Sequence, residues 1–227
     1  MLKKIYVVGI SPHPSLMTCT ARELIEKAPA IIVLDTDYPF DLSGLLKGKR
    51  VVKLTPGFKA QENREEVLRR NRELVLNLDV DWAVWLEIGT PSVRNPVERH
   101  LLGEIPPGLE VEFVPGVSSV TAVLDRLRAI ARHLCVFGGE ETERIGKAVE
   151  ACDLFVIIHL KDREAVDLLE SRGYKVFFVE ECCTEREKVT REFSGRTYWT
   201  IAVAYKDGSV FLGGKGPFSD EGNDSGT

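Results

Sequence analysis

VEFVPGVSS, residues 111–119, joins three structural signals in one short stretch. Its first half is apolar and β-prone, Pro115-Gly116 is typical of a tight turn, and Ser118 or Ser119 can cap a helix that follows. A strand, a turn and a capped helix in this order present free backbone N–H groups and hydroxyls. We therefore expect this stretch to help bind the carboxylate or phosphate of a small ligand.

Apolar runs and amphipathic runs alternate before that stretch. Continuous apolar runs predict buried strands, and apolar residues spaced by three or four predict helices. Strands are expected at 5–8, 30–34, 50–54, 82–86 and 110–114, with helices at 20–28, where Thr20 to Glu23 have capping-box spacing, and at 61–78. This alternation predicts a mostly parallel sheet that is covered on both faces.

The pattern restarts after Pro115. Helices are expected at 118–133, 140–150 and 163–171, and strands at 132–137, 154–158 and 175–179. Residues 198–205 and 210–212 are expected to form a terminal hairpin, which would make the second sheet mixed. The predicted fold is α/β, with an N-terminal α/β domain at 1–114, a C-terminal α/β domain at 115–216, a ligand cleft between them and a disordered tail at 217–227.

Composition narrows the class of protein. The 227 residues are 44% hydrophobic and 29% charged, which is typical of a globular chain, and the net charge of −5 argues against a general nucleic-acid surface. No apolar run approaches the ~20 residues that cross a bilayer. The apolar run Ile5–Val8 is too short for a signal-peptide core, so we expect a cytoplasmic protein.

The cysteines form no C-x-x-C pair, and we expect them to be buried or half-buried structural thiols. Adjacent Cys182 and Cys183 are unfavourable both for a disulfide and for a corner of a tetrahedral metal site. No spacing of His, Cys and carboxylate residues predicts a closed metal site. The five cysteines are Cys19, Cys135, Cys152, Cys182 and Cys183.

Two further loops follow predicted strands. The first, residues 9–18, has only Gly9, and its Pro12 and Pro14 lack N–H donors, which argues against a dinucleotide-binding loop. In the second, residues 87–96, Gly89 allows close backbone approach, Thr90 offers a hydroxyl and Arg94 can pair with an anion. From this loop alone, an ordinary turn between a strand and a helix is the favoured interpretation.

Taken in order, the three loops resemble those of the tetrapyrrole (corrin/porphyrin) methylases. The resemblance runs from Lys4 to about Tyr205 and is strongest over 111–122. It implies two α/β domains, S-adenosyl-L-methionine as the cofactor and a homodimer. Residues 135–139 and 179–187 resemble most the branch that methylates C5 of cobalt-precorrin-7, which implies a corrin precursor as substrate.

The resemblance also implies which residues form the site. Catalytic side chains are not required, because methyl transfer depends mostly on aligning two bound reactants. A corrin precursor carries many carboxylates, so His13, Arg94 and Arg99 are expected to bind it, although His13 and Arg99 also suit exposed surface positions. Any cobalt would arrive with the substrate. The residues expected to bind the cofactor are Pro12, Gly89, Thr90, Val93, Ser118, Ser119, Leu160, Glu181 and Cys182.

The chain departs from the family pattern in two loops. The usual first loop, G-x-G-P-G-D-P, is one residue shorter here and keeps only Gly9, and Thr90 stands where the second loop usually has Asp. These departures leave two alternatives open: a divergent member that binds without catalysing, and a methylase with another substrate, such as the diphthine-forming branch. The C5 branch further implies a separate decarboxylating, C15-methylating partner protein.

Overall fold

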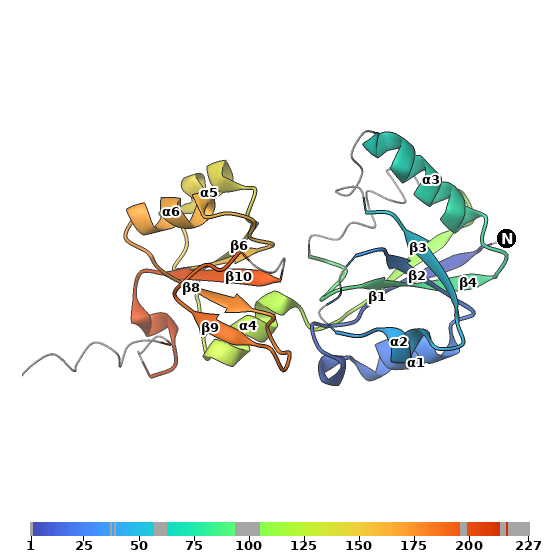
Figure 1. Ribbon diagram of the computed structural model, residues 1–227, viewed down its shortest axis with the longest axis horizontal. Helices are drawn as coiled ribbons and strands as arrows, with labels where there is room; N and C mark the ends of the chain where they lie inside the picture. The colour runs from blue at the N-terminus through green and yellow to red at the C-terminus, as the bar shows by residue number, and fades with distance from the viewer. Residues whose placement is uncertain are drawn as a thin grey trace, which may run out of the picture. The chain divides into compact units, whose positions relative to one another are not determined.

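The computed structural model describes residues 2–36, 38, 40–56, 63–93, 105–195, 199–213 and 217. The chain divides into two compact units, Met1–Ser118 and Ser119–Thr227, and each has its own sheet (Figure 1). The tail expected at 217–227 lies outside the described residues apart from Pro217. None of the described helices is long and apolar enough to cross a membrane.

The sheet of the first unit has parallel pairing between all its neighbouring strands, as the mostly parallel prediction implies. The strands lie in the order β3-β2-β4-β1-β5. Helices α1 (Cys19–Lys27) and α2 (Ser43–Leu46) cover one face, and α3 (Arg64–Leu76) covers the other (Figure 1). The strands are β1 (Lys4–Gly9), β2 (Ala30–Leu34), β3 (Arg50–Leu54), β4 (Trp82–Glu87) and β5 (Glu110–Val114).

Strand β2 shows why these runs are apolar throughout. All five of its residues are buried, and successive side chains point to opposite faces of the sheet. Ile31 belongs to the cluster that contains Ile25 of α1, whereas Ile32 belongs to the cluster that contains Val75 of α3. A parallel strand with helices on both sides needs apolar side chains at every position.

Helix α1 begins earlier than the capping-box spacing predicts. Thr18, not Thr20, is the N-cap, and its Oγ1 accepts the N–H of Ala21 at 3.2 Å. The Thr18 hydroxyl also donates to the carbonyl of Pro115 at 3.4 Å. Thr18 and Thr20 are both suitable N-cap residues. The bond from Thr18 to Pro115, 97 positions away in the sequence, favours Thr18.

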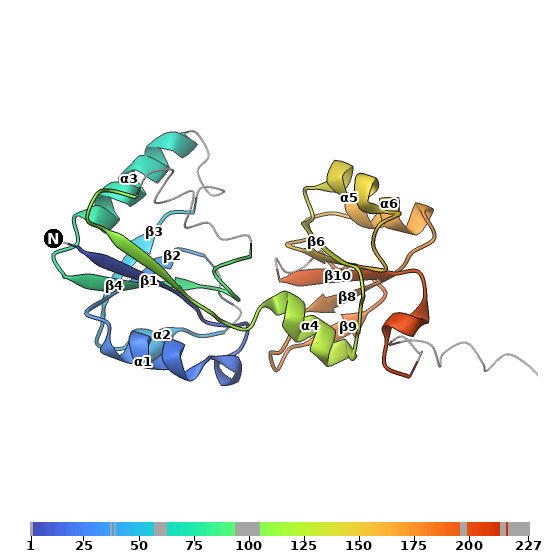
Figure 2. The same cartoon turned by 180° about the vertical axis from the view of Figure 1, so that it is seen from behind.

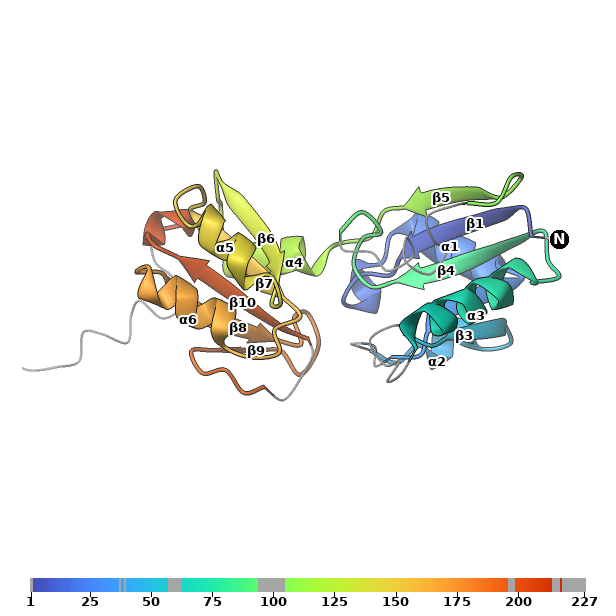
Figure 3. The same ribbon diagram turned by 90° about the horizontal axis from the view of Figure 1, so that it is seen from above.

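The second unit has the mixed sheet that the sequence predicts. Strands β6 and β7 pair in parallel, β10 pairs antiparallel with β7 and β8, and β9 pairs antiparallel with β8. Helices α5 (Thr142–Ala148) and α6 (Glu164–Ser171) cover one face, and α4 (Ser119–Leu127) lies on the opposite face (Figure 2). The strands are β6 (Leu134–Gly138), β7 (Leu154–Ile158), β8 (Lys175–Glu180), β9 (Lys188–Thr190) and β10 (Thr200–Tyr205), in the spatial order β6-β7-β10-β8-β9 (Figure 3).

The predicted terminal hairpin is wrong. Strand β10 has β7 on one side and β8 on the other, so neither of its edges is open to residues 210–212. Gly208–Val210 instead form a turn of 3₁₀ helix, and Phe211 forms an isolated antiparallel bridge with Ala129. A local turn signal cannot show that two distant strands already occupy both edges of a strand.

Helix α4 is shorter than the predicted helix at 118–133, because it ends at Leu127. Arg128 adopts a left-handed φ of 54°. The N–H of Arg128 donates to the carbonyl of Asp125 at 3.1 Å, and that of Ala129 donates to Leu124 at 2.8 Å. This pair of bonds is a Schellman motif, which ends a helix and usually has glycine at the left-handed position.

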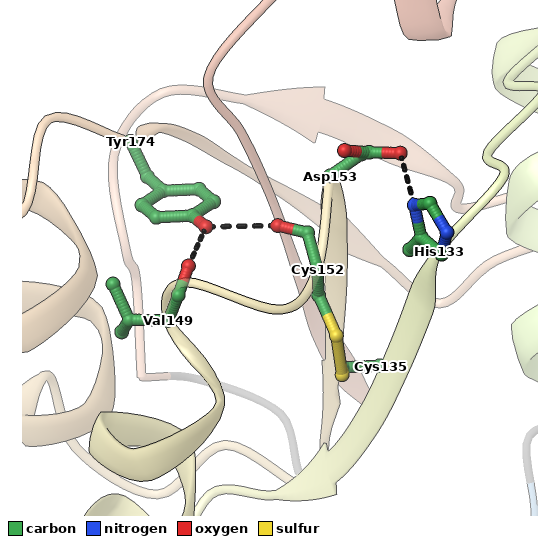
Figure 4. The surroundings of a disulfide bond; sticks show 6 residues. All are labelled: His133, Cys135, Val149, Cys152, Asp153 and Tyr174. Atoms are coloured by element: carbon green, nitrogen blue, oxygen red, sulfur yellow. Dashed lines mark hydrogen bonds and ion pairs between the residues drawn. A yellow bond between two sulfur atoms is a disulfide. The ribbon is translucent and has the colours of Figure 1, made fainter.

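A disulfide joins Cys135 of β6 to Cys152, two residues before β7, so the prediction of free thiols is wrong for these two (Figure 4). Parallel pairing of β6 with β7 brings their Cα atoms to 6.0 Å. The Tyr174 hydroxyl lies within hydrogen-bonding distance of the carbonyls of Val149, at 2.6 Å, and Cys152, at 2.9 Å (Figure 4). Cys19 is a free but exposed thiol, which also departs from the prediction.

Candidate functional site

Three glycines meet where neighbouring strands β4, β1 and β5 of the first unit end. A Cβ atom at Gly9 would lie 2.4 Å from the carbonyl oxygen of Gly89 and 2.6 Å from the nitrogen of Gly116. A Cβ atom at Gly116 would lie 2.2 Å from the same Gly89 oxygen. No side chain fits between main chains this close, so the first and third loops need Gly9 and Gly116 for steric reasons, while Gly89 of the second loop has a left-handed φ of 80°.

Ser11 joins the first loop to the third. Its hydroxyl accepts the N–H of Val117 at 2.9 Å and donates to the carbonyl of Leu16 at 3.0 Å. Ser11 is fully buried and has a left-handed φ of 61°. The sequence analysis missed it, because a serine beside two prolines has many local uses and its partner Val117 lies 106 positions away.

The first unit also contains residues that the resemblance assigns to the cofactor. Pro12 is buried, Thr90 is half-buried, and Gly89 has a φ of 80°. The N–H of Val93 donates to the carbonyl of Thr90 at 3.2 Å, which closes a turn after β4. Ser118 immediately precedes α4, at the capping position that its sequence predicts.

The predicted substrate-binding residues are less fully described. His13 caps the 3₁₀ turn Pro14–Leu16, since its Nδ1 accepts the N–H of Ser15 at 3.2 Å and lies 2.7 Å from the Ser15 hydroxyl. The local turn therefore orients the His13 ring. Arg94 and Arg99 lie outside the described residues.

Glu87 is a buried carboxyl group that the sequence analysis did not single out. It ends β4 opposite Gly9 of β1, and its Oε1 accepts the indole N–H of Trp85 at 2.7 Å. Burial raises the pKa of Glu87 from 4.5 to about 8, and the indole bond opposes this only partly. Burial and the nearby Glu87 also raise the pKa of Tyr38. The carboxyl of Glu87 therefore keeps its proton near neutral pH. In the sequence, the only indication of this residue was its position, an acidic side chain at the end of an apolar strand.

In the second unit, the loops after β7 and β8 meet at the start of β10. The N–H of Leu160 donates to the carbonyl of Thr200 at 3.5 Å, and that of Glu181 donates to Trp199 at 3.3 Å. A Cβ atom at Gly139, after β6, would lie 3.1 Å from the Cα of Leu160. Within the second unit, Leu160, Glu181 and the adjacent Cys182 thus follow the carboxyl ends of β7 and β8.

Strained backbone marks the same loops. Among the described residues, five other than glycine have a positive φ, and one of them, Arg128, ends a helix. The other four lie in loops that follow the carboxyl ends of strands β1, β7 and β8: Ser11, His159, Glu181 and Cys183. Such residues cost about 1–3 kcal/mol each and concentrate at functional sites. The loops at these strand ends, in each unit, are therefore candidate binding surfaces.

Comparison with known proteins identifies the family. The model of the tetrapyrrole (corrin/porphyrin) methylases matches residues 4–195. The cobalamin biosynthesis protein CbiHC of Archaeoglobus fulgidus is 34% identical over 122 residues, which are 52% of this chain and 25% of that protein. The cobalt-precorrin-4 C(11)-methyltransferase of Priestia megaterium is 28% identical over 120 residues, which are 52% of this chain and 44% of that protein. The chain thus spans less than half the length of either curated relative.

Solved structures show the same fold. The uroporphyrin-III C-methyl transferase of Thermus thermophilus, complexed with S-adenyl homocysteine, superposes with a TM-score of 0.67. The superposition covers 89% of this chain and 97% of that one at 20% sequence identity. The family model spans most of the chain, and its glycine-bearing loops meet in the structure. This chain therefore belongs to the tetrapyrrole (corrin/porphyrin) methylases.

Proposed function

We propose that this chain is an S-adenosyl-L-methionine-dependent C-methyltransferase that acts on a corrin precursor in cobalamin biosynthesis, at C5. The junction of Gly9, Gly89 and Gly116 carries the proposal, because the loops most like the family converge there main chain to main chain. The similarity to a cobalamin biosynthesis protein supports a corrin precursor as the substrate class. Segments 135–139 and 179–187, which resemble the C5 branch, support the position of methylation.

The residues present suit the proposed cofactor. Bound S-adenosyl-L-methionine supplies a methyl group on a positively charged sulfur. Gly89, Thr90 and Val93 would bind its methionine part together with Pro12, and they follow the buried Glu87, whose raised pKa leaves its carboxyl uncharged near neutral pH. The hydroxyls of Ser118 and Ser119 would bind its polar groups.

In the second unit, Leu160 would line the adenine pocket, as the resemblance implies. Glu181 and Cys182 follow β8, and the N–H of Glu181 is tied to β10. Binding by these residues would align the donor with a substrate carbon, which supplies most of the catalysis without a side-chain nucleophile. His13, Arg94 and Arg99 would bind the carboxylates of the substrate.

Thr90 favours a second candidate, a divergent member that binds ligand or partner without transferring methyl. A neutral hydroxyl accepts hydrogen bonds from an ammonium group more weakly than a carboxylate does. Binding without turnover would support this candidate. The first proposal also includes a homodimer and a separate decarboxylating, C15-methylating partner protein. Size-exclusion chromatography tests the homodimer by the apparent mass of the chain alone, and the partner by its co-elution with the chain.

Calorimetric titration with S-adenosyl-L-methionine and S-adenosylhomocysteine tests the cofactor site. The wild type should bind both saturably, and Ser118→Leu should weaken binding at least about tenfold by displacing a polar contact. Thr90→Asp should tighten S-adenosyl-L-methionine binding by about tenfold, because it adds a charge-assisted hydrogen bond. Gly44→Ala is the matched control, since its Cβ meets nothing within 4 Å. Absence of binding by folded wild type would overturn the proposal.

Transfer is tested with methyl-¹³C-labelled S-adenosyl-L-methionine and corrin precursors, with and without cobalt. The proposal expects one labelled methyl in the product, which carbon NMR assigns to C5. Labelling at another ring carbon would keep the enzyme class and reject the position. Cofactor binding with no transfer to any precursor would favour the non-catalytic candidate.

A further inference from the structure

The loop that follows β8 gathers three metal-binding side chains, of which the proposed function uses only Cys182. The sulfurs of Cys182 and Cys183 lie 3.5 Å apart. One carboxylate oxygen of Glu187 completes a group whose ligand atoms all lie within 4.8 Å of one another. Cys182 is 5% exposed, and the side chain of Glu187 is 11% exposed. The three ligands are thus largely screened from bulk water.

Backbone geometry explains how adjacent cysteines come to share one side. Side chains of neighbouring residues normally diverge, which is why the sequence predicts no metal corner here. Glu181 and Cys183, however, have left-handed φ values of 47° and 65°, on either side of Cys182. Non-glycine residues in this region cost about 1–3 kcal/mol each, so the surrounding contacts must impose the turn.

Those contacts lie within the loop itself. The hydroxyl and the N–H of Thr184 both donate to the carbonyl of Glu181, at 2.8 and 3.1 Å. The N–H of Glu187 donates to the carbonyl of Thr184 at 3.1 Å, and the N–H of Cys183 donates to Oε2 of Glu187 at 2.6 Å. These bonds position the carboxylate beside the two sulfurs without any ion.

The spacing suits a borderline-soft divalent ion. In a tetrahedral zinc site, Zn–S bonds of about 2.3 Å place two sulfurs about 3.8 Å apart. The Cys182 and Cys183 sulfurs need to separate by only a few tenths of an ångström to reach that distance. Two thiolates and a carboxylate are three zinc ligands, and the fourth position is left for water or an exchangeable ligand.

Charge balance also favours a divalent ion. Arg126 of α4 contacts Glu187, with 2.6 Å between Nε and Oε1. Two thiolates and one carboxylate carry three negative charges, which a divalent ion and the Arg126 guanidinium neutralise together. Buried ionic groups are tolerated when their charges are compensated in this way.

We propose that Cys182, Cys183 and Glu187 form a binding site for one borderline-soft divalent metal ion, with Zn²⁺ as the probe. Binding forms two metal–sulfur bonds and one metal–oxygen bond, and the two thiol protons leave to solvent. The site shares Cys182 with the proposed cofactor site, but its metal-binding test does not depend on methyl transfer. Its use of both sulfurs distinguishes it from the role of Cys182 in lining the cofactor site.

The test titrates the full-length, reduced chain with Zn²⁺ against a chromophoric chelator, and native mass spectrometry counts the ions. Cd²⁺ provides a spectroscopic signature, because thiolate ligands give it a strong ultraviolet charge-transfer absorption. We expect one ion per chain. Cys183→Ser and Glu187→Gln should each weaken Zn²⁺ binding by about 100-fold or more, since even indirect partners of a metal contribute 10–100-fold.

Two matched controls separate this site from general metal binding. Cys19→Ser removes an exposed thiol elsewhere, and Glu185→Gln removes an exposed carboxylate from the same loop, so both should leave Zn²⁺ affinity unchanged. Glu187→Gln keeps an oxygen that can accept the Cys183 N–H, and circular dichroism melts confirm that each variant is folded. Failure of the reduced wild type to bind Zn²⁺ would overturn the proposal. So would a Zn²⁺ affinity of Cys183→Ser and Glu187→Gln equal to that of the wild type. Conversion of Cys182 and Cys183 into a disulfide without metal uptake by the reduced chain would also overturn it.

Discussion

The two units build the loops at the ends of their strands in different ways. In the first unit, three glycines allow main chains to touch, and a Cβ atom at Gly116 would lie 2.2 Å from a carbonyl oxygen. In the second unit, His159, Glu181 and Cys183 take left-handed φ values although none of them is glycine. Contact between main chains excludes every side chain, whereas a positive φ only makes a side chain unfavourable. Glycine is therefore required in the first case and replaceable in the second.

The largest expected effect is at the glycine junction. Gly116→Ala places a Cβ atom against main-chain atoms of Gly9 and Gly89, which cannot move as a flexible side chain does. We expect the free energy of unfolding to fall by more than about 3 kcal/mol and cofactor binding to be lost. Denaturant unfolding measures the first effect and calorimetry the second.

Gly44→Ala is the control for that substitution, because its Cβ has nothing within 4 Å. It should be neutral or stabilise by up to about 1 kcal/mol, since Gly44 lies in helix α2. Equal stability of Gly116→Ala and Gly44→Ala would show that the junction has room for a side chain and would remove the contrast between the units.

A smaller effect is expected from the buried acid at the same edge. The pKa of Glu87 is raised to about 8 in the folded chain and is near 4.5 in the unfolded chain. Between these values the unfolded state binds fewer protons, so stability should fall as pH rises, by at most about 1.4 kcal/mol per pH unit. Below about 4.5 both states are protonated and above about 8 both are ionised, so the slope vanishes.

Glu87→Gln should remove that slope, because an amide does not titrate. Relative to wild type, it should gain stability progressively as pH rises from 5 to 8, by up to about 1.4 kcal/mol per pH unit, as measured by urea unfolding across the pH range. Glu26→Gln, at an exposed position, should leave the slope unchanged. Parallel pH curves for wild type and Glu87→Gln would contradict the role of burial at Glu87.

The smallest effect concerns two helix ends of the second unit. Helix α6 ends in the same Schellman motif as α4, with Gly173 at the left-handed position, φ 81°, where α4 has Arg128, φ 54°. Gly173→Ala should cost about 1 kcal/mol, because its Cβ meets nothing and only the backbone is strained. Arg128→Gly should stabilise by about 0.5–1 kcal/mol, because it relieves the strain and loses some of that gain to chain entropy.

Denaturant midpoints of these two variants sharpen the comparison between strain and steric exclusion. Opposite signs would confirm that a left-handed residue other than glycine is a tolerated strain in this unit. A neutral Gly173→Ala would mean that a left-handed φ has little energetic effect in this unit, including at His159, Glu181 and Cys183.

Much of the fold could be predicted because its signals are local. The apolar run of β2 and the spacing of α1 identify a strand and a helix from a few neighbouring residues. The order of the three loops also pointed to the family, since each glycine stands directly beside the end of a strand. The predictions failed where a distant partner decides: Thr18 rather than Thr20 caps α1, and β10 pairs inside the sheet rather than in a hairpin.

The candidate site divides in the same way. Gly89, Leu160 and Glu181 could be named from the sequence by resemblance, but Ser11 and Glu87 could not, because their roles depend on burial and on partners across the sheet. The Cys135–Cys152 disulfide depends on strand pairing that brings the two Cα atoms to 6.0 Å.

The sequence by itself determined the alternation of strands and helices and the three loops that mark the family. Hydrophobic periodicity and glycine sterics act between near neighbours, so they can be read in order along the chain. Only the tertiary structure decided which strands pair, which cysteines form a disulfide, and that Cys182 and Cys183 face Glu187. Strand pairing and the disulfide depend on contacts between distant segments, and the Cys182–Cys183–Glu187 group depends on a strained turn held by hydrogen bonds within its loop, and neither leaves a recognisable pattern in the sequence.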